Sequence, residues 1–404
     1  MFRGDAPMKC LWIARYIPYP MDAGAKVYSA QLAQSLAAAG VSIRFLGFGR
    51  AAAAPAQSRI EWIAVPGEQR GRAAALFSAL PLAAASDATD AYVALLDEQL
   101  REHWDVIVLD GYGAGWALDR CYASPNGQQR PLLVHVSHNH EAALWRSMVR
   151  GARTSLPKRL ALCQNYLKVR ALECRIVRNV DLLTTITAED ALAFGHSGTH
   201  ERALTLTPGH TGWKATERVI DSLTPRRAII VGSFRWAMKQ ENLRRFVELA
   251  DPILARNDIE LDIVGDVPGA LLDPLRERCR ATRFFGFVDD LAPFLSQARI
   301  AVVPELIGGG FKLKFLDYIF ARVPVATLSR AAAGFPDDIR RATLSCEDLP
   351  ALTTAIVSYI DRFDELNRMQ QSAFGAAEAL FDWRDRGLQL QQAMCHLRQE
   401  LTGS

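Results

Sequence analysis

Short apolar runs alternate with longer amphipathic segments along the chain, and this alternation limits the fold more than any other feature of the sequence. Apolar runs of strand length that are separated by segments of helical length are typical of βαβ units and a parallel sheet. The pattern stops in a stretch rich in Pro, Gly and Thr, residues 204–225, and then begins again. The sequence therefore predicts an α/β protein with two successive Rossmann-like domains.

The expected strands are defined by their apolar runs, and helices are expected between them, for example at 25–39 and 91–102. In the first half the expected strands are 9–14, 42–47, 60–65, 104–110, 131–137 and 180–187. In the second half they are 227–232, 259–265, 283–287, 299–304 and 323–328.

Composition excludes several classes of protein. The chain has 404 residues, of which 50% are hydrophobic and 23% charged, which is typical of a soluble globular protein with two or three domains. A net charge of +3 does not indicate a nucleic-acid partner. We expect no membrane span and no signal peptide, and we expect residues 1–7 to be a dispensable extension. The seven cysteines are scattered without zinc-site spacing, which favours reduced thiols and a cytoplasmic location.

Polar segments follow several of the predicted strands. Open parallel sheets bind ligands beyond the carboxyl ends of their strands, so two such domains that face each other would form a cleft lined by these ends. The segments expected there are 15–24, 110–115, 137–141, 232–239 and 304–314.

The most distinctive of these segments is glycine-rich. Gly308, Gly309 and Gly310 follow a predicted buried strand, and Lys312 and Lys314 precede a predicted helix. Glycines let backbone N–H groups approach a ligand, and a helix N-terminus and two ammonium groups add positive charge. These features suit a bound diphosphate. The alternative is an ordinary glycine-rich turn with solvated lysines.

Five segments, taken in order, resemble glycosyltransferases of the GT-B fold, closest to family 4. Residues 13–25 resemble the opening loop near the sugar and acceptor, and 229–242 resemble the first strand and phosphate loop of the second domain. Residues 284–295 resemble the stretch beside the nucleotide base, 304–317 the donor-binding motif, and 381–383 the aromatic signature before the last helix.

This resemblance implies a domain organisation. An acceptor-binding Rossmann-like domain is expected over 1–205 and a nucleotide-sugar donor-binding domain over 206–380. The final helix, 381–404, is expected to cross back to the first domain. The two domains of the GT-B fold face each other across a cleft.

The sequence also departs from the family pattern, in which two glutamates separated by seven residues contact the donor. Gly309 stands at the first acidic position and Asp317 at the second, which contacts the ribose. The sugar contacts then fall to the backbone of Gly309 and Gly310 or to another side chain. The other candidates for the donor diphosphate are Gly232, Arg235, Lys239, Lys312 and Lys314.

The candidate catalytic residues lie in the first half. His138 or His140 could hydrogen-bond the sugar or the acceptor hydroxyl; alternatively, Asn139 or His138 could cap the following helix. Asp110 is a candidate acceptor base or, equally, a turn residue. The resemblance adds an acceptor or sugar loop with Arg15, Asp22 and Gly24, and a hinge residue, His210, that can touch the donor.

The function implied by the resemblance is that of a hexosyltransferase. It would move a sugar from a nucleotide-diphosphate sugar to an acceptor hydroxyl in cell-surface polysaccharide or glycoconjugate synthesis. A carbohydrate, lipid-linked or small-molecule acceptor is expected, with retention of anomeric configuration and without metal or cofactor. A nucleotide-sugar epimerase of the same fold and a catalytically silent nucleotide-sugar-binding scaffold remain alternatives. A nicotinamide dehydrogenase is disfavoured because Arg15 and Tyr16 follow the first strand where Gly-x-Gly-x-x-Gly would be needed.

A basic stretch over residues 145–178 contains nine Lys and Arg residues and one acid, Glu173. Leucines and a tyrosine are interspersed among them. This composition suits docking on an anionic membrane surface, which would make the protein peripheral on the inner face of the membrane. The alternative is a solvated helical face whose long side chains cover the core.

Overall fold

The computed structural model describes residues 7–51, 54–55, 59–71, 77–122, 130–151, 154–196, 202–306 and 311–401. The chain divides into two compact units. The first unit contains Met1–Pro208 and Trp383–Ser404, and the second contains Gly209–Asp382. The boundaries expected from the sequence are residues 205 and 380.

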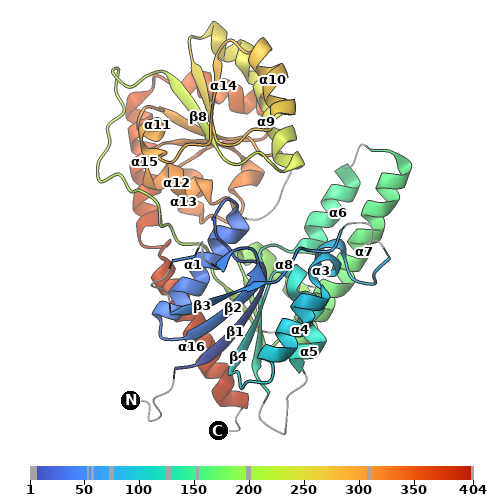
Figure 1. Ribbon diagram of the computed structural model, residues 1–404. Helices are drawn as coiled ribbons and strands as arrows, with labels where there is room; N and C mark the ends of the chain where they lie inside the picture. The colour runs from blue at the N-terminus through green and yellow to red at the C-terminus, as the bar shows by residue number, and fades with distance from the viewer. Residues whose placement is uncertain are drawn as a thin grey trace. The chain divides into compact units, whose positions relative to one another are not determined.

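The first unit is built on a parallel sheet of seven strands in the order β3-β2-β1-β4-β5-β6-β7 (Figure 1). The strands are β1 (Lys9–Tyr16), β2 (Ser42–Phe48), β3 (Ile60–Val65), β4 (Val106–Asp110), β5 (Leu132–Val136), β6 (Leu182–Thr185) and β7 (Ala203–Thr205). The first six correspond to predicted strands. The seventh was not predicted because it is a partly exposed edge strand of three residues without an apolar run.

Helices cover both faces of this sheet, which explains why its central strands are apolar throughout. The helices of the first unit are α1 (Gly24–Ala38), α3 (Leu82–Asp87), α4 (Asp90–Gln99), η2 (Tyr112–Ala117), α5 (Leu118–Tyr122), α6 (Glu141–Gly151), α7 (Leu156–Asn179), α8 (Ala188–His196) and α16 (Trp383–Leu401). Along β1, Leu11 and Ile13 enter the core formed with α4, η2 and α7. Trp12 points the other way and stacks on Phe45, with ring centroids 5.7 Å apart.

The last helix, α16, packs against α1 in the first unit. The Trp383 ring lies edge-on to Tyr28, with centroids 5.4 Å apart. The Arg386 Nε atom donates to the carbonyl oxygen of Thr207 over 2.7 Å. Gly387 lies so close to α1 that a Cβ atom there would be 2.2 Å from the Ser35 carbonyl oxygen. The two helices therefore touch backbone to backbone at this glycine.

The second unit repeats the architecture with six parallel strands in the order β10-β9-β8-β11-β12-β13. They are β8 (Arg227–Val231), β9 (Glu260–Val264), β10 (Thr282–Gly286), β11 (Ile300–Val303), β12 (Val325–Leu328) and β13 (Leu344–Cys346). Its helices are α9 (Ala237–Arg256), α10 (Gly269–Arg278), α11 (Ala292–Ser296), α12 (Lys314–Phe320), η4 (Ser329–Ala332), α13 (Asp337–Arg341), α14 (Leu349–Tyr359) and α15 (Phe363–Glu378). The predicted α/β class with two Rossmann-like sheets is confirmed; β13 was not predicted.

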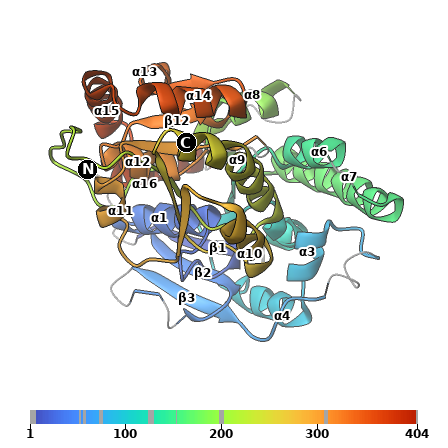
Figure 2. The ribbon, with the colours of Figure 1, turned by 90° about the horizontal axis from the view of Figure 1, so that it is seen from above.

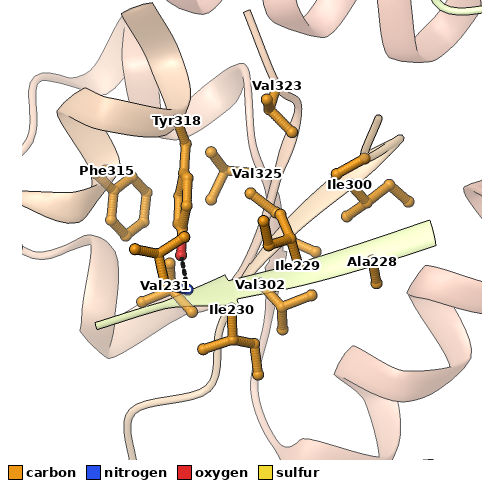
Figure 3. Close-up of a cluster of buried hydrophobic side chains, with 14 of the residues drawn as sticks. Ala228, Ile229, Ile230, Val231, Ile300, Val302, Phe315, Tyr318, Val323 and Val325 are labelled. Atoms are coloured by element: carbon orange, nitrogen blue, oxygen red, sulfur yellow. Dashed lines mark hydrogen bonds between the residues drawn. The ribbon is translucent and has the colours of Figure 1, made fainter. Parts of the chain in front are cut away.

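Figure 3 shows the core of the second unit, in which α12 packs on the sheet through Phe315 and Tyr318. Both side chains are fully buried. The Tyr318 hydroxyl accepts a hydrogen bond from the Val231 N–H over 2.7 Å, at the last residue of β8. This bond satisfies a buried backbone donor and fixes α12 to the carboxyl end of β8.

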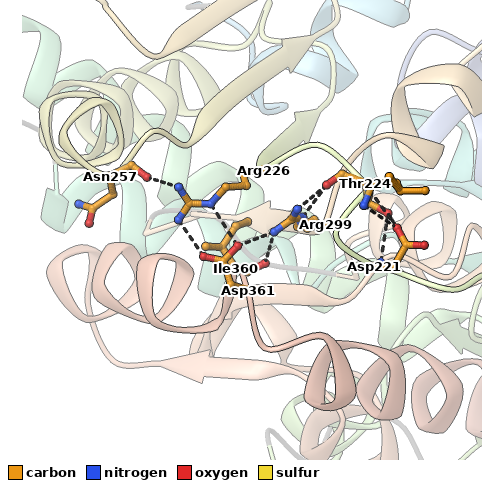
Figure 4. A network of polar contacts seen from close by, with 8 residues as sticks. Asp221, Thr224, Arg226, Asn257, Arg299, Ile360 and Asp361 are labelled. Carbon is orange, nitrogen blue, oxygen red and sulfur yellow. Dashed lines mark hydrogen bonds and ion pairs between the residues drawn. The ribbon is translucent and has the colours of Figure 1, made fainter.

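A polar network lies at the amino ends of the strands of the same sheet (Figure 4). The Arg299 guanidinium donates to the carbonyl oxygens of Thr224 and Ile360. Arg226 donates to the Asn257 carbonyl oxygen and pairs with Asp361 at 2.8 Å. The network joins the segment before β8 to the end of α14, so the amino ends of the strands are held by structural ion pairs.

Replacing Gly387 with alanine is expected to destabilise the first unit. The new methyl group would meet the Ser35 backbone, so α16 would have to move away from α1. We expect a loss of about 1–3 kcal/mol in the free energy of unfolding, measured by urea denaturation.

Gly375→Ala in α15 is the matched control, because a Cβ atom at Gly375 meets nothing within 4 Å. Alanine favours a helix interior by about 0.8–1 kcal/mol over glycine, so this variant should be equally or more stable than wild type. Equal stability of the Gly387 and Gly375 variants would contradict the close packing of α16 on α1.

Candidate active site

The carboxyl edge of the second sheet brings together most of the residues expected to bind the donor. Gly232 follows β8 directly, and its carbonyl oxygen would lie 1.9 Å from a Cβ atom on Gly265, which follows β9. Gly265 also has a φ of +132°, a conformation that favours glycine. These two loops pack backbone to backbone and form the floor of the site.

Three lysines of the same unit lie near one another and near Glu305: Lys239 from α9, Lys312 before α12 and Lys314 at its start. Lys314 pairs with Glu305, which follows β11 by two residues. Burial, together with the neighbouring Lys314 and Lys239 charges, lowers the pKa of Lys312 to about 8, although Glu305 opposes the shift. Burial and the Lys314 charge also lower the pKa of Lys239. One carboxylate among three ammonium groups leaves an excess of positive charge that a phosphate group would relieve.

Other residues expected at the diphosphate are placed differently. Arg235 pairs with Asp266, and its side chain is 72% exposed. Gly309 and Gly310 lie outside the described residues. Among the donor-site residues that the structure describes, positive charge therefore concentrates on the lysines rather than on Arg235.

Asp317 lies in the first turn of α12, three residues after Lys314, and is partly buried. Burial raises the pKa of its carboxyl group to about 7. The Nδ1 atom of His210 lies 3.6 Å from its Oδ1 atom. The His210 ring is fixed by stacking on Phe320, with centroids 4.5 Å apart, and by a contact of Nε2 with the Trp213 carbonyl oxygen at 3.3 Å. His210 thus contacts the residue expected at the ribose.

In the first unit, Asp110 at the end of β4 is held from two sides. Its Oδ2 atom accepts from Trp12 Nε1 over 2.8 Å, and its Oδ1 atom lies 2.6 Å from His138 Nε2. Burial alone would lower the pKa of His138, but the charge and hydrogen bond of Asp110 outweigh burial and raise it. The buried Nδ1 atom of His138 has no hydrogen-bond partner among the described residues.

His140 has a different environment. Its Nδ1 atom accepts from the Ala143 N–H over 3.1 Å, and burial lowers its pKa. The N–H groups of Glu141 and Ala142 donate to the Glu173 carboxylate over 2.6 and 2.9 Å. The first turn of α6 is therefore capped by His140 and Glu173. The capping role that the sequence allows for Asn139 or His138 falls instead to their neighbour, and His138 faces Asp110.

The predicted acceptor loop follows β1. Asp22 pairs with Lys26 at 2.9 Å, and Gly24 begins α1. Arg15 lies 3.3 Å from Asp87, a fully buried carboxylate at the end of α3. Burial raises the pKa of Asp87 to about 7 against the opposing effect of Arg15. Asp87 was not predicted as a site residue because a single Asp in an alanine-rich segment carries no recognisable motif.

One groove of the second unit lies elsewhere. It is lined by residues at the amino ends of the strands, including Arg226, Ile259 and Ala281, and by parts of α9 and α10. It contains none of the predicted site residues. In the described part of the chain, no group of three or more His, Cys, Asp or Glu side chains is arranged to hold a metal ion. No described helix is long and apolar enough to cross a membrane.

Comparison with solved structures defines the class of the fold. The chain is similar to WaaG, a glycosyltransferase involved in lipopolysaccharide biosynthesis, at 18% identity and a TM-score of 0.66, over 96% of this chain and 99% of that chain. It is also similar to HepE from Anabaena, solved in complex with UDP-glucose, at 14% identity and a TM-score of 0.67, over 96% and 100%. At these identities the likeness establishes the fold, which is GT-B.

The family assignment rests on the second unit. Residues 225–362 match the family described as glycosyl transferases group 1. The chain is therefore a GT-B protein that carries a group 1 glycosyltransferase domain, and the resemblance inferred from its sequence is confirmed. No curated protein matches the chain.

The two histidines should titrate on opposite sides of the ordinary histidine pKa of about 6.5. Asp110 raises the pKa of His138, whereas burial lowers the pKa of His140. Histidine signals followed by NMR through a pH titration would give both values.

Asp110→Asn should lower the pKa of His138 and leave that of His140 unchanged, because His140 has no contact with Asp110 among its described partners. Assignment by His138→Gln and His140→Gln identifies the signals. A pKa of His138 that does not respond to Asp110→Asn would contradict the ion pair.

Proposed function

We propose that this protein transfers a sugar from a nucleoside-diphosphate sugar to an acceptor hydroxyl. The cluster of Lys239, Lys312 and Lys314 is the observation that carries the proposal. The cluster lies at the carboxyl ends of the strands, where parallel α/β domains bind nucleotides. HepE, which shares the fold, was solved with UDP and with UDP-glucose, so UDP-sugars are the first donors to test.

In the proposed reaction, the bond between the anomeric carbon and the β-phosphate oxygen breaks, and the acceptor oxygen forms the new bond. The acceptor proton passes to the departing phosphate oxygen, which suits retention of configuration. Negative charge grows on the diphosphate during this step. Preorganised ammonium groups stabilise such charge without reorganisation, and three lysines supply positive charge without a metal. Asp317 accepts hydrogen bonds from the ribose hydroxyls.

The first unit supplies His138 to the sugar or the acceptor. Asp110 is 5% exposed, and both its carboxylate oxygens are engaged. We therefore assign Asp110 to holding His138 rather than to accepting a proton from the acceptor. The Nδ1 atom of the imidazole would form a hydrogen bond with a hydroxyl group of the sugar or the acceptor.

Lys312→Ala should weaken UDP binding by about 1–3 kcal/mol, the contribution of a charge-assisted hydrogen bond. In wild type, UDP affinity should fall about tenfold from pH 7 to pH 9, because Lys312 has a pKa of about 8 before UDP binds and loses its proton over this range. Isothermal titration calorimetry at several pH values measures both effects.

Arg235→Ala is the control, since Arg235 is already paired with Asp266 on the surface. It should bind UDP within about threefold of wild type. Lys312→Ala that binds UDP as well as wild type would remove the lysine cluster from the donor site. Tight UDP binding without hydrolysis or transfer of any sugar from a broad donor panel would favour the silent scaffold.

We also propose that the protein acts on the inner face of a membrane through the basic pair of helices α6 and α7. Figures 1 and 2 show these helices lying side by side, and Figure 1 shows them extending away from the first sheet. Exposed side chains near their joined ends combine positive charge with leucine; they are Arg146, Arg150, Leu156, Lys158, Arg159 and Leu160. The sequence contains no Asp or Glu between Glu141 and Glu173. This combination fits anionic headgroups and the acyl boundary beneath them.

The double variant Lys158→Glu, Arg159→Glu should lose most of its binding to vesicles that contain 30% phosphatidylserine. Each basic residue near such a surface contributes about 1 kcal/mol, so replacing two by acids should reduce partitioning at least about tenfold. Vesicle sedimentation measures the bound fraction.

The control, Arg101→Glu with Arg256→Glu, makes the same change in net charge at exposed sites elsewhere. It should bind vesicles like wild type. Equal loss in both double variants would indicate a general charge effect, and binding to neutral phosphatidylcholine vesicles would contradict the electrostatic basis.

A further inference from the structure

Arg15 at the end of β1 has an unusual set of contacts. Its Nε atom is buried, and its side chain as a whole is 38% exposed. Asp87 holds the guanidinium from one side at 3.3 Å, and the Tyr16 ring lies under it at 5.0 Å. Among the described residues, Asp87 is the one carboxylate in contact with the Arg15 guanidinium. The guanidinium is therefore fixed in place by one carboxylate and one ring, and part of the side chain remains exposed.

Burying the Asp87 carboxylate costs free energy of folding. Its side chain is 1% exposed, Gln69 donates to its Oδ1 atom over 2.5 Å, and its Oδ2 atom has no partner within the described ranges. Burying a carboxylate without full hydrogen bonding destabilises a fold, so this residue contributes something other than stability. The Asp87 carboxylate holds the Arg15 side chain, which is partly exposed at the surface.

Arg15 lies close to the proposed catalytic histidine. Gly111 follows β4, and Gly113 lies in η2, two residues further along the chain. A Cβ atom on Gly111 would contact the His138 ring at 3.5 Å, and one on Gly113 would contact Asp87 Oδ2 at 3.2 Å. His138 and the Arg15–Asp87 pair therefore both lie beside the segment 111–113.

We propose that Arg15 binds an anionic group, a phosphate or a carboxylate, on the acceptor. Guanidinium groups bind such oxyanions with two parallel hydrogen bonds, and the planar fork here is already held by Asp87 and Tyr16. The acceptor hydroxyl would then lie on the same molecule, near His138. The inference rests on the proposed function, since it names the acceptor class of that site.

The test compares matched anionic and neutral probes by calorimetry, with UDP at saturation so that the lysine cluster is occupied. Glycerol 3-phosphate and glucuronate are titrated beside glycerol and glucose. Dihexanoyl phosphatidic acid and dihexanoyl phosphatidylcholine, both below their micelle concentrations, form the lipid arm. Wild type should bind the anionic member of at least one pair at least tenfold more tightly. Tighter binding of phosphatidic acid than of glycerol 3-phosphate assigns the anion to a lipid headgroup, and the reverse assigns it to a soluble acceptor.

Arg15→Gln should abolish this preference, and Arg15→Lys should retain part of it. Arg70→Gln is the control, because Arg70 pairs with the exposed Asp90 at 2.8 Å. If Arg15→Gln fails to fold, the double variant Arg15→Gln, Asp87→Asn removes the unpaired carboxylate and takes its place.

Two results would overturn the inference. The first is equal binding of anionic and neutral probes by wild type. The second is a loss of UDP affinity in Arg15→Gln as large as its loss of affinity for the anionic probe. The second would assign Arg15 to the donor. Absence of UDP binding by wild type would instead contradict the proposed function, and the probe titrations without UDP would still test Arg15.

Discussion

The hydrogen bond from the Val231 N–H to the Tyr318 hydroxyl is the contact on which the proposed donor site depends. It joins the end of β8 to α12, and these two elements carry Gly232 on one side and Lys314 and Asp317 on the other. Because Tyr318 is fully buried, the bond is shielded from water and the two elements cannot shift independently. Charged groups that repel one another are thus held at the same sheet edge by the core beneath them.

The site residues of the first unit are also held in place by their neighbours, but through pairs of opposite charges and not through a cluster of like charges. Asp110 holds His138, and Asp87 holds Arg15, so each carboxylate orients one basic side chain. The charged residues at the amino ends of the strands in the second sheet, by comparison, have a structural role. There Arg226 and Arg299 are fully engaged with carbonyl and carboxylate oxygens, which leaves little capacity for a ligand.

The sequence predicted the α/β class and most strands because parallel strands covered on both faces are continuous apolar runs. It missed β7 and β13, which have three residues each and lie at sheet edges. Side-chain partners were harder to predict. Nothing in the sequence distinguishes His138 from His140, yet one faces Asp110 and the other caps α6. Asp87 and Glu305 gain their importance from tertiary contacts with Arg15 and Lys314, which no local pattern records.

A crystal structure with a bound nucleoside diphosphate tests the central claim most directly. The diphosphate chosen should be the one, among UDP, GDP, ADP and CDP, that raises the melting temperature most. We predict that its phosphate oxygens contact Lys312 and at least one of Lys239 and Lys314, with the ribose beside Asp317. A nucleotide bound in the groove beside Arg226 and Ala281, with the three lysines unoccupied, would contradict it.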